Sequence, residues 1–292
     1  MEKVVLKANA KINLTLDVTG KREDGYHILD MIMHSINIYD EITIKKNYKN
    51  IINVSSNISG LETDESNSAY KAASIIKSEK EFDGVDIFIN KNIPIGAGMA
   101  GGSADAAAVI VGINKLFNLE LGSEKMKEIA LKVGADVPFC IDGGCVRARG
   151  IGQIMEKLPT VDLNLLIIKP DESISTEYVY KNLNLAEIKR RPDNINFINS
   201  MAKNELDEMV KYMDNVLESV TTKNIEQILE IKKDMLKFKA KVSMMTGSGT
   251  AVFGIFDSIS DLNTCYENIK AKYKNVFCTK TVKGGVNIES WD

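Results

Sequence analysis

Residues 94–108 read PIGAGMAGGSADAAA. Four of them are glycines, at Gly96, Gly98, Gly101 and Gly102. Glycine permits backbone turns that aim successive N–H groups at one point, and the alanine-rich stretch that follows predicts a helix over 103–117. A helix N-terminus adds unpaired N–H donors and the positive end of the helix dipole. The segment predicts a phosphate-binding loop; the alternative is a tight loop that only joins a strand to a helix.

The same glycines match the G-x-G-x-x-G pattern of dinucleotide-binding proteins. That fold needs a buried strand ending at the first glycine and an acidic residue ending the next strand about 20 residues later. Here 90–94 separates the preceding strand from the glycines, and Glu120 lies between two predicted helices. We therefore exclude an NAD-binding Rossmann fold. No G-x-x-x-x-G-K-[ST] occurs, which excludes a Walker-type nucleotidase.

The composition is that of an ordinary globular protein, with 292 residues, 44% hydrophobic, 26% charged and a net charge of −3. At about 150 residues per domain this length favours two domains. Without a basic excess we expect no nucleic-acid partner. Four cysteines without a Cys-x-x-Cys pair and two histidines exclude a common structural zinc site. Neither a secretory signal nor a spanning helix is expected, so we predict a cytoplasmic protein with no membrane partner.

Periodicity outward from the glycine loop predicts an α+β protein. In the first half we expect strands over 4–6, 12–18, 36–38, 41–45, 51–54 and 85–89, with helices over 66–78, 103–117 and 124–132. In the second half we expect strands over 163–168, 242–245, 252–256 and 275–282, with helices over 176–182, 195–201, 204–213, 225–237 and 262–272. The closing order of strand, strand, helix and strand is typical of a small α+β layer. We place the domains at 1–159 and 160–292.

Two further glycine-containing segments carry candidate functional residues. GADVPF at 134–139 places Asp136 at a corner before Pro138, and MTGSGT at 245–250 separates two predicted strands. Taken alone, Asp136 also fits a turn former, and Gly247 and Gly249 also fit hairpin glycines.

Four segments in this order resemble the GHMP small-molecule kinases: AKINLTLDVTGKREDGYH (10–27), PIGAGMAGGSADAA (94–107), GADVPFCIDGG (134–144) and TGSGTAVF (246–253). The resemblance implies a ribosomal-protein-S5-like N-terminal domain and a ferredoxin-like C-terminal domain, with ATP and substrate between them. AKIN at 10–13 followed by DGYH at 24–27 resembles the members that phosphorylate the 2-hydroxyl of cytidine-diphosphate-linked methylerythritol, in the non-mevalonate isoprenoid pathway.

The resemblance also assigns site residues. Asp136 takes the proton from the substrate hydroxyl, and Lys11 stabilises the developing alkoxide and the transferring phosphoryl. Because the transition state of phosphoryl transfer is loose, the proton can leave late and an ordinary aspartate suffices as the base. ATP is implied to contact Asn67, Lys71, Pro94, Gly96, Gly98, Met99, Ala100, Gly101, Gly102, Ser103 and Ala104, with Ser103 also the expected Mg²⁺ ligand. The substrate is implied to contact Asn13, Tyr26, His27, Thr176, Tyr180, Gly247 and Ser248.

The chain departs from the family pattern at a few positions. Ala104 replaces a second serine, Thr246 replaces a serine, Ala251 replaces a threonine or valine, and His34 replaces a glutamine. Other functions stay open here: a GHMP kinase acting on homoserine, mevalonate or a sugar, or an inactive relative that only binds ligands. The aromatic residues Tyr26 and Tyr180 favour a base-containing substrate, because a small aliphatic one has no use for stacking. Monomer and homodimer are both left open.

Overall fold

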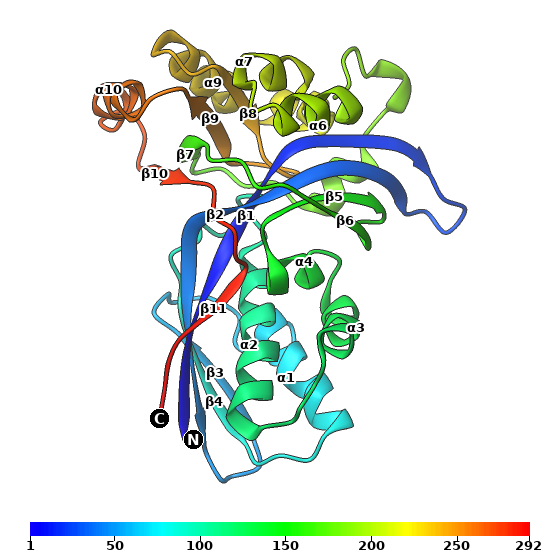
Figure 1. Cartoon of the computed structure of the whole chain (residues 1–292), viewed down its shortest axis with the longest axis vertical. Coiled ribbons are helices and arrows are strands. Elements are labelled where there is room, and N and C mark those ends of the chain that lie inside the picture. Colours follow the sequence, from blue (N-terminus) through cyan, green and yellow to red (C-terminus); the bar gives the residue numbers. More distant parts are fainter.

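One long hairpin organises the first sheet. The protein, described over residues 1–292 by a computed structural model, begins with β1 (Lys3–Lys21) paired antiparallel with β2 (His27–Lys46), and the far half of this hairpin projects as an arm (Figure 1). β1 alternates buried and half-buried residues up to Ala8, as a strand with one covered face does. From Ala8 to Val18 every residue is buried, because elements of the second half cover the other face.

The sheet around this hairpin has seven strands. The order is β11-β1-β2-β4-β3, and β5 and β6 extend it from the far half of β2. The additional strands are β3 (Ile52–Ser56), β4 (Val85–Asn90), β5 (Cys145–Gly150), β6 (Ile154–Leu158) and β11 (Val286–Trp291). The sequence predicted one strand for each of β3 and β4, two short strands for each of β1 and β2, and none for β5, β6 or β11.

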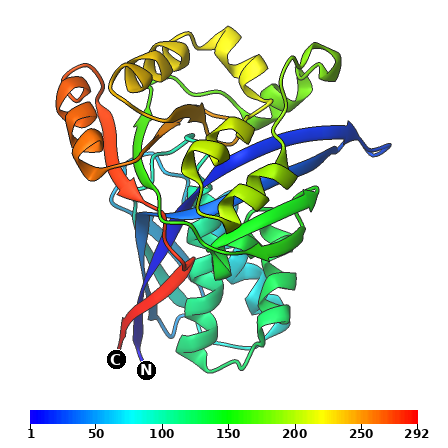
Figure 2. The ribbon, with the colours of Figure 1, turned by 45° about the horizontal axis from the view of Figure 1, so that its top comes forward.

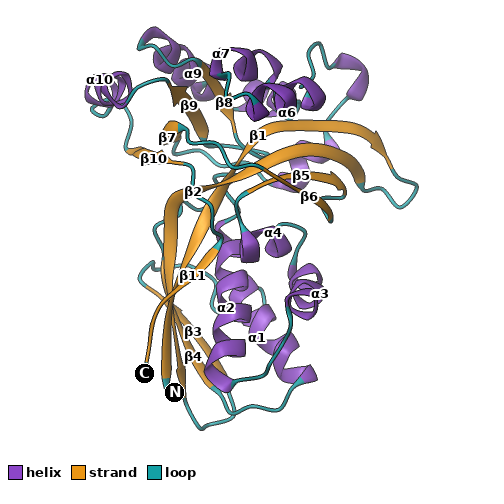
Figure 3. Ribbon diagram, viewed as in Figure 1, coloured by secondary structure: helices purple, strands orange, loops and turns teal.

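Four helices cover one face of this sheet, as Figure 3 shows. They are α1 (Ser68–Glu79), α2 (Gly101–Phe117), α3 (Ser123–Val133) and α4 (Val137–Asp142). Small residues let α2 approach the strands closely: a Cβ at Gly112 would lie 2.5 Å from Cδ1 of Ile44. The sequence predicted that α2 begins at Ser103, two residues after its actual start at Gly101. α4 was not predicted, because it is short and contains Pro138.

The second sheet confirms the predicted ferredoxin-like layer. Its four antiparallel strands follow the order β10-β7-β9-β8, which in chain order is 4-1-3-2. The strands are β7 (Asn164–Lys169), β8 (Val242–Met245), β9 (Val252–Phe256) and β10 (Asn275–Lys280). The helices are α5 (Thr176–Lys181), α6 (Asn194–Ala202), α7 (Leu206–Met209), α8 (Glu218–Asn224), α9 (Gln227–Lys237) and α10 (Ile259–Ile269). α9 and α10 pack on this sheet, while α6 contacts the β1–β2 arm (Figure 2).

Backbone pairing joins the two halves. Residue 16 of β1 bridges to Asn215, Ile36 of β2 bridges to Thr281, and β11 returns from the end of the chain to the edge of β1. The division at 159/160 stays a prediction. None of the helices combines the length and the apolar character that a bilayer-spanning helix needs.

His34 is a buried link between β2 and the start of the second half. Its side chain is 0% exposed. Nδ1 lies 2.9 Å from the carbonyl oxygen of Ser35, and Nε2 lies 3.3 Å from the backbone nitrogen of Val161. Nε2 therefore accepts the Val161 N–H while Nδ1 carries the proton, so the ring is neutral. Burial lowers the pKa of His34 from its usual 6.5.

This environment predicts a loss of stability in mild acid. Because the unfolded chain takes up a proton on His34 near pH ~6.5 and the folded chain resists it, the free energy of unfolding should fall as the pH drops from about 7 to about 5. His34→Gln should flatten this fall in urea titrations. His27→Gln, at the half-buried second histidine, should flatten it less. Equal slopes in wild type and His34→Gln would contradict the assignment.

Candidate active site

The glycine loop borders a large cavity. The cavity has a volume of about 1090 Å³, just above the usual range for a pocket that holds one ligand, so it has room for two ligands. Its walls come from the β1–β2 arm, the loop before α1, the glycine loop with the first turn of α2, the residues before α4, the helix α5 and the loop between β8 and β9.

The loop takes a left-handed backbone conformation at alternate residues. The φ angles of Gly96, Gly98 and Ala100 are 65°, 71° and 58°. Such alternation is the geometry that turns backbone N–H groups toward one concave point, and the N-terminus of α2 lies directly behind it. Ala100 holds this conformation without being glycine, a strain that concentrates at ligand-binding segments. The predicted phosphate-binding loop therefore has the geometry of an anion site.

A second glycine loop packs backbone to backbone on the first. The N–H groups of Thr250 and Ala251 donate to the carbonyl oxygens of Gly96 and Ala97, at 3.3 and 3.2 Å. A Cβ at Gly98 would lie 2.2 Å from the carbonyl oxygen of Thr246. A side chain there would push the two loops apart, so this contact requires glycine.

The two predicted catalytic residues lie together at the junction of these loops. Nζ of Lys11 is 2.6 Å from Oδ1 of Asn13, 3.1 Å from the carbonyl oxygen of Gly98 and 3.8 Å from Oδ2 of Asp136. The Lys11 side chain is only 5% exposed, whereas that of Asp136 is 32% exposed and faces the cavity. Asp136 directly precedes α4, so the corner expected around Pro138 is the first turn of a helix. A buried ammonium beside an accessible carboxylate suits proton removal and charge stabilisation at one point.

Aromatic rings line another part of the cavity. The ring centroids of His27 and Tyr180 are 5.2 Å apart, with the ring planes tilted by 36°. Tyr26 is 62% exposed, and Oγ1 of Thr176 lies 2.8 Å from Oγ of Ser248. Burial raises the pKa of Tyr180, and burial together with Lys21 lowers the pKa of His27. Near neutral pH this wall presents an uncharged imidazole and a protonated phenol.

Comparison with known proteins identifies the family. The family model of the GHMP kinases N terminal domain matches residues 67–144, and the model of the GHMP kinases C terminal domain matches residues 197–275. The 4-diphosphocytidyl-2-C-methyl-D-erythritol kinase of Clostridioides difficile (strain 630) is 44% identical over 291 residues, covering 99% of this chain and 98% of the relative. The chain belongs to the GHMP kinases. The kinase of the same name from Clostridium perfringens (strain 13 / Type A) is 46% identical, covering 95% of this chain and 98% of the relative.

Solved GHMP kinase structures share the whole fold. A crystal structure of 4-(cytidine 5'-diphospho)-2C-methyl-D-erythritol kinase superposes with a TM-score of 0.81 at 25% identity, covering 97% of this chain and 99% of the other. A homoserine kinase from Cytophaga hutchinsonii superposes with a TM-score of 0.79 at 18% identity, covering 99% and 98%. These matches confirm the predicted α+β fold with its two GHMP kinase domains.

Two of the residues predicted to bind ATP lie outside the cavity lining of this GHMP kinase. Lys71 lies on the exposed face of α1, and Ala104 is buried in α2. All the other predicted catalytic, ATP-binding and substrate-binding residues line the cavity. Asn67 does so as the N-cap of α1, where Oδ1 accepts the N–H of Ala69 at 2.8 Å and Nδ2 donates to the carbonyl oxygen of Glu62 at 2.6 Å. Its side chain is thus already used to hold the loop before α1.

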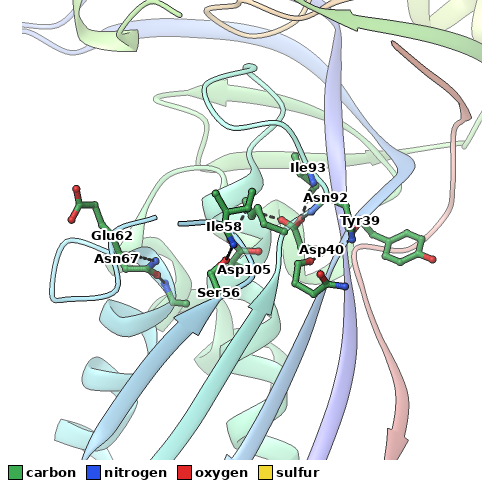
Figure 4. A network of polar contacts seen from close by, with 12 residues as sticks. Tyr39, Asp40, Ser56, Ile58, Glu62, Asn67, Asn92, Ile93 and Asp105 are labelled. Atoms are coloured by element: carbon green, nitrogen blue, oxygen red, sulfur yellow. Dashed lines mark hydrogen bonds and ion pairs between the residues drawn. The ribbon is translucent and has the colours of Figure 1, made fainter. Parts of the chain in front are cut away.

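A buried ion cluster behind the glycine loop was not predicted. Nζ of Lys91 lies 2.6 Å from Oδ2 of both Asp40 and Asp105, and the three side chains are at most 5% exposed. Asp40 also accepts the backbone N–H groups of Asn92 and Ile93, as Figure 4 shows. Oδ1 of Asp105 has no partner, and burial raises the pKa of this carboxyl to about 8. The only signal in the sequence is a lysine three residues before the glycine loop.

We expect the ion cluster to hold the glycine loop in place. Lys91→Met removes the one cation that lies between the buried side chains of Asp40 and Asp105, a change that costs roughly 3–5 kcal/mol of unfolding free energy. Lys71→Met, at an exposed lysine, should cost less than about 0.5 kcal/mol. Urea unfolding of both variants at pH ~7 measures the difference, and a similar small loss in both would show that the cluster contributes nothing.

Proposed function

We propose that this GHMP kinase transfers the γ-phosphoryl group of ATP to the 2-hydroxyl of 4-diphosphocytidyl-2-C-methyl-D-erythritol. The observation that carries the proposal is the position of Lys11 and Asp136 beside the glycine loop, in a cavity whose other wall holds His27 and Tyr180. The relatives that match the chain over nearly its full length carry the name of this kinase. ATP occupies the glycine-loop side of the cavity, and the cytidine lies at the aromatic side.

The chemistry is a direct transfer between two bound ligands. The substrate hydroxyl oxygen forms a bond to the γ-phosphorus as the bond from phosphorus to the β,γ-bridging oxygen breaks, and ADP leaves. The hydroxyl proton passes to the carboxylate of Asp136. Lys11 faces the transferring group and offsets its negative charge, while the loop N–H groups and the α2 N-terminus hold the phosphates.

The donor atoms at the loop suit a magnesium ion carried by ATP. No group of three or more His, Cys, Asp or Glu side chains could hold a metal ion by itself. Mg²⁺ keeps several waters and binds substrate phosphates with one or two protein ligands, which requires little more than the Ser103 hydroxyl on the cavity wall. When bound, the ion neutralises charge on the β- and γ-phosphates.

Base recognition follows from the aromatic wall. An aromatic face stacks on a base with about 1–3 kcal/mol, but stacking does not distinguish one base from another. We assign Tyr26 and Tyr180 to stacking and the polar atoms of His27 to the edge of the pyrimidine. The hydroxyls of Thr176 and Ser248, 2.8 Å apart, lie where a polar methylerythritol group can replace their mutual hydrogen bond.

The assignment is tested by a coupled assay for ADP release. The purified wild type with ATP and Mg²⁺ should phosphorylate 4-diphosphocytidyl-2-C-methyl-D-erythritol, and the product should carry the phosphate on the 2-oxygen. Homoserine and mevalonate, offered at the same concentration, should give at least ~100-fold lower kcat/KM, because neither has a base to occupy the aromatic wall. Preferred use of either compound overturns the proposal.

Asp136→Asn tests the base. We expect kcat to fall by about 10²–10⁴-fold, since an amide accepts no proton, while the KM for ATP stays within about threefold. Asp142→Asn is the matched control at the other end of α4, where the carboxylate pairs with Lys127 and Lys157 outside the cavity. It should keep the wild-type rate. An Asp136→Asn enzyme with unchanged kcat would remove Asp136 from the mechanism.

A further inference from the structure

Thr246 lies between the groups that hold the ammonium of Lys11. Oγ1 of Thr246 accepts the backbone N–H of Asn13 at 2.9 Å and donates to the carbonyl oxygen of Gly98 at 3.4 Å. Asn13 and Gly98 are the residues whose oxygen atoms accept from Nζ of Lys11, at 2.6 and 3.1 Å. One hydroxyl thus contacts both residues that orient the lysine.

Hydrogen bonds on both sides hold Thr246 in its position. The side chain is 0% exposed, and its own N–H donates to the carbonyl oxygen of Ala251 at 2.9 Å. Nδ2 of the buried Asn215 donates to the carbonyl oxygens of Met245 and Gly247, the residues on either side, at 2.8 and 2.9 Å. Asn215 in turn bridges to β1 at residue 16, three positions beyond Asn13. The loop that carries the hydroxyl is therefore fixed relative to β1, because Asn215 is hydrogen-bonded to the loop and paired with β1.

We propose that Thr246 is a positioning residue for phosphoryl transfer, which sets the place of the Lys11 ammonium through Asn13 and Gly98. The role rests on the proposed function, in which Lys11 stabilises the transferring group. Thr246 has no atom on the cavity wall, so it acts through the lysine rather than on a ligand. Its hydroxyl comes from the second half of the chain and orients a lysine of the first half. The chemistry thus depends on the two halves being joined.

Two substitutions separate the hydroxyl from the shape of the side chain. Thr246→Val keeps the shape and removes the hydroxyl, and Thr246→Ser keeps the hydroxyl and removes a methyl group. We expect kcat to fall between about tenfold and a hundredfold in Thr246→Val, the size of effect that a small displacement of a catalytic group produces. KM for both substrates should stay within about threefold, and Thr246→Ser should stay within about threefold of wild type in kcat.

Thr281→Val is the matched control for lost stability. The Thr281 hydroxyl is also buried, accepts the N–H of Leu163 at 2.9 Å and donates to the carbonyl oxygen of Val161 at 2.5 Å, away from the cavity. Its loss should lower the unfolding midpoint about as much as the loss of the Thr246 hydroxyl and leave kcat unchanged. An equal fall of kcat in both variants overturns the proposal.

A double-variant cycle decides whether Thr246 acts through Lys11. In a Lys11→Met background, Thr246→Val should lower the remaining single-turnover rate by less than about twofold, because the group it positions is gone. If Thr246→Val lowers the single-turnover rate in this background as much as it does in the wild type, Thr246 has a general structural role and the proposal is overturned. If Thr246→Val does not fold, Thr246→Ser and Thr246→Ala, which differ only in the hydroxyl, give the same comparison.

These results separate the inference from the proposed function. A wild type that phosphorylates the cytidine-linked substrate, with Thr246→Val equally fast, overturns the role of Thr246 alone. A wild type that does not phosphorylate this substrate overturns the proposed function, whatever the variants show.

Discussion

The carbonyl oxygen of Gly98 is the point on which the site depends. It accepts from Nζ of Lys11 and from Oγ1 of Thr246, and the lack of a side chain on its own residue allows the two glycine loops to touch. One peptide group thereby links the phosphate-binding loop, β1 and the loop between β8 and β9. Because each of these segments is held again by backbone pairing elsewhere, the distances around Lys11 follow from the packing of both halves.

This arrangement explains how a chain with a net charge of −3 can hold a triphosphate. The positive character at the loop comes mainly from backbone N–H groups and the α2 N-terminus, which add no formal charge. Lys11 is the cation aimed into the cavity beside the loop, since Lys91 is occupied by Asp40 and Asp105. Charge is concentrated by geometry at one point rather than spread over a basic surface.

The fold could be predicted where residues repeat with a local period. The second sheet and the helices α1, α2 and α3 follow from such patterns, with ends displaced by a few residues. β1 was predicted as two strands, because the apolar positions in its middle are Ala8 and Ala10, and alanine has a low strand propensity. Asn9 and Lys11 are polar and yet buried, since they lie where the second half covers the hairpin and the site needs polar atoms. β11, which pairs with β1 from almost a whole chain length away, was not predicted.

The sequence by itself determined the local chemistry of this protein. It identified a glycine loop before a helix and the family whose motifs the chain matches, and it led to Lys11 and Asp136 as the proposed reacting pair. Only the tertiary structure decided which groups surround that pair. Asn13 and Thr246 are in contact although 233 positions separate them. Asp40 on β2 lies beside Lys91, which follows β4, and Lys91 also pairs with Asp105 on α2. A single sequence carries no periodic signal for such contacts, because they arise from the packing of whole elements and not from the residues near them in the chain.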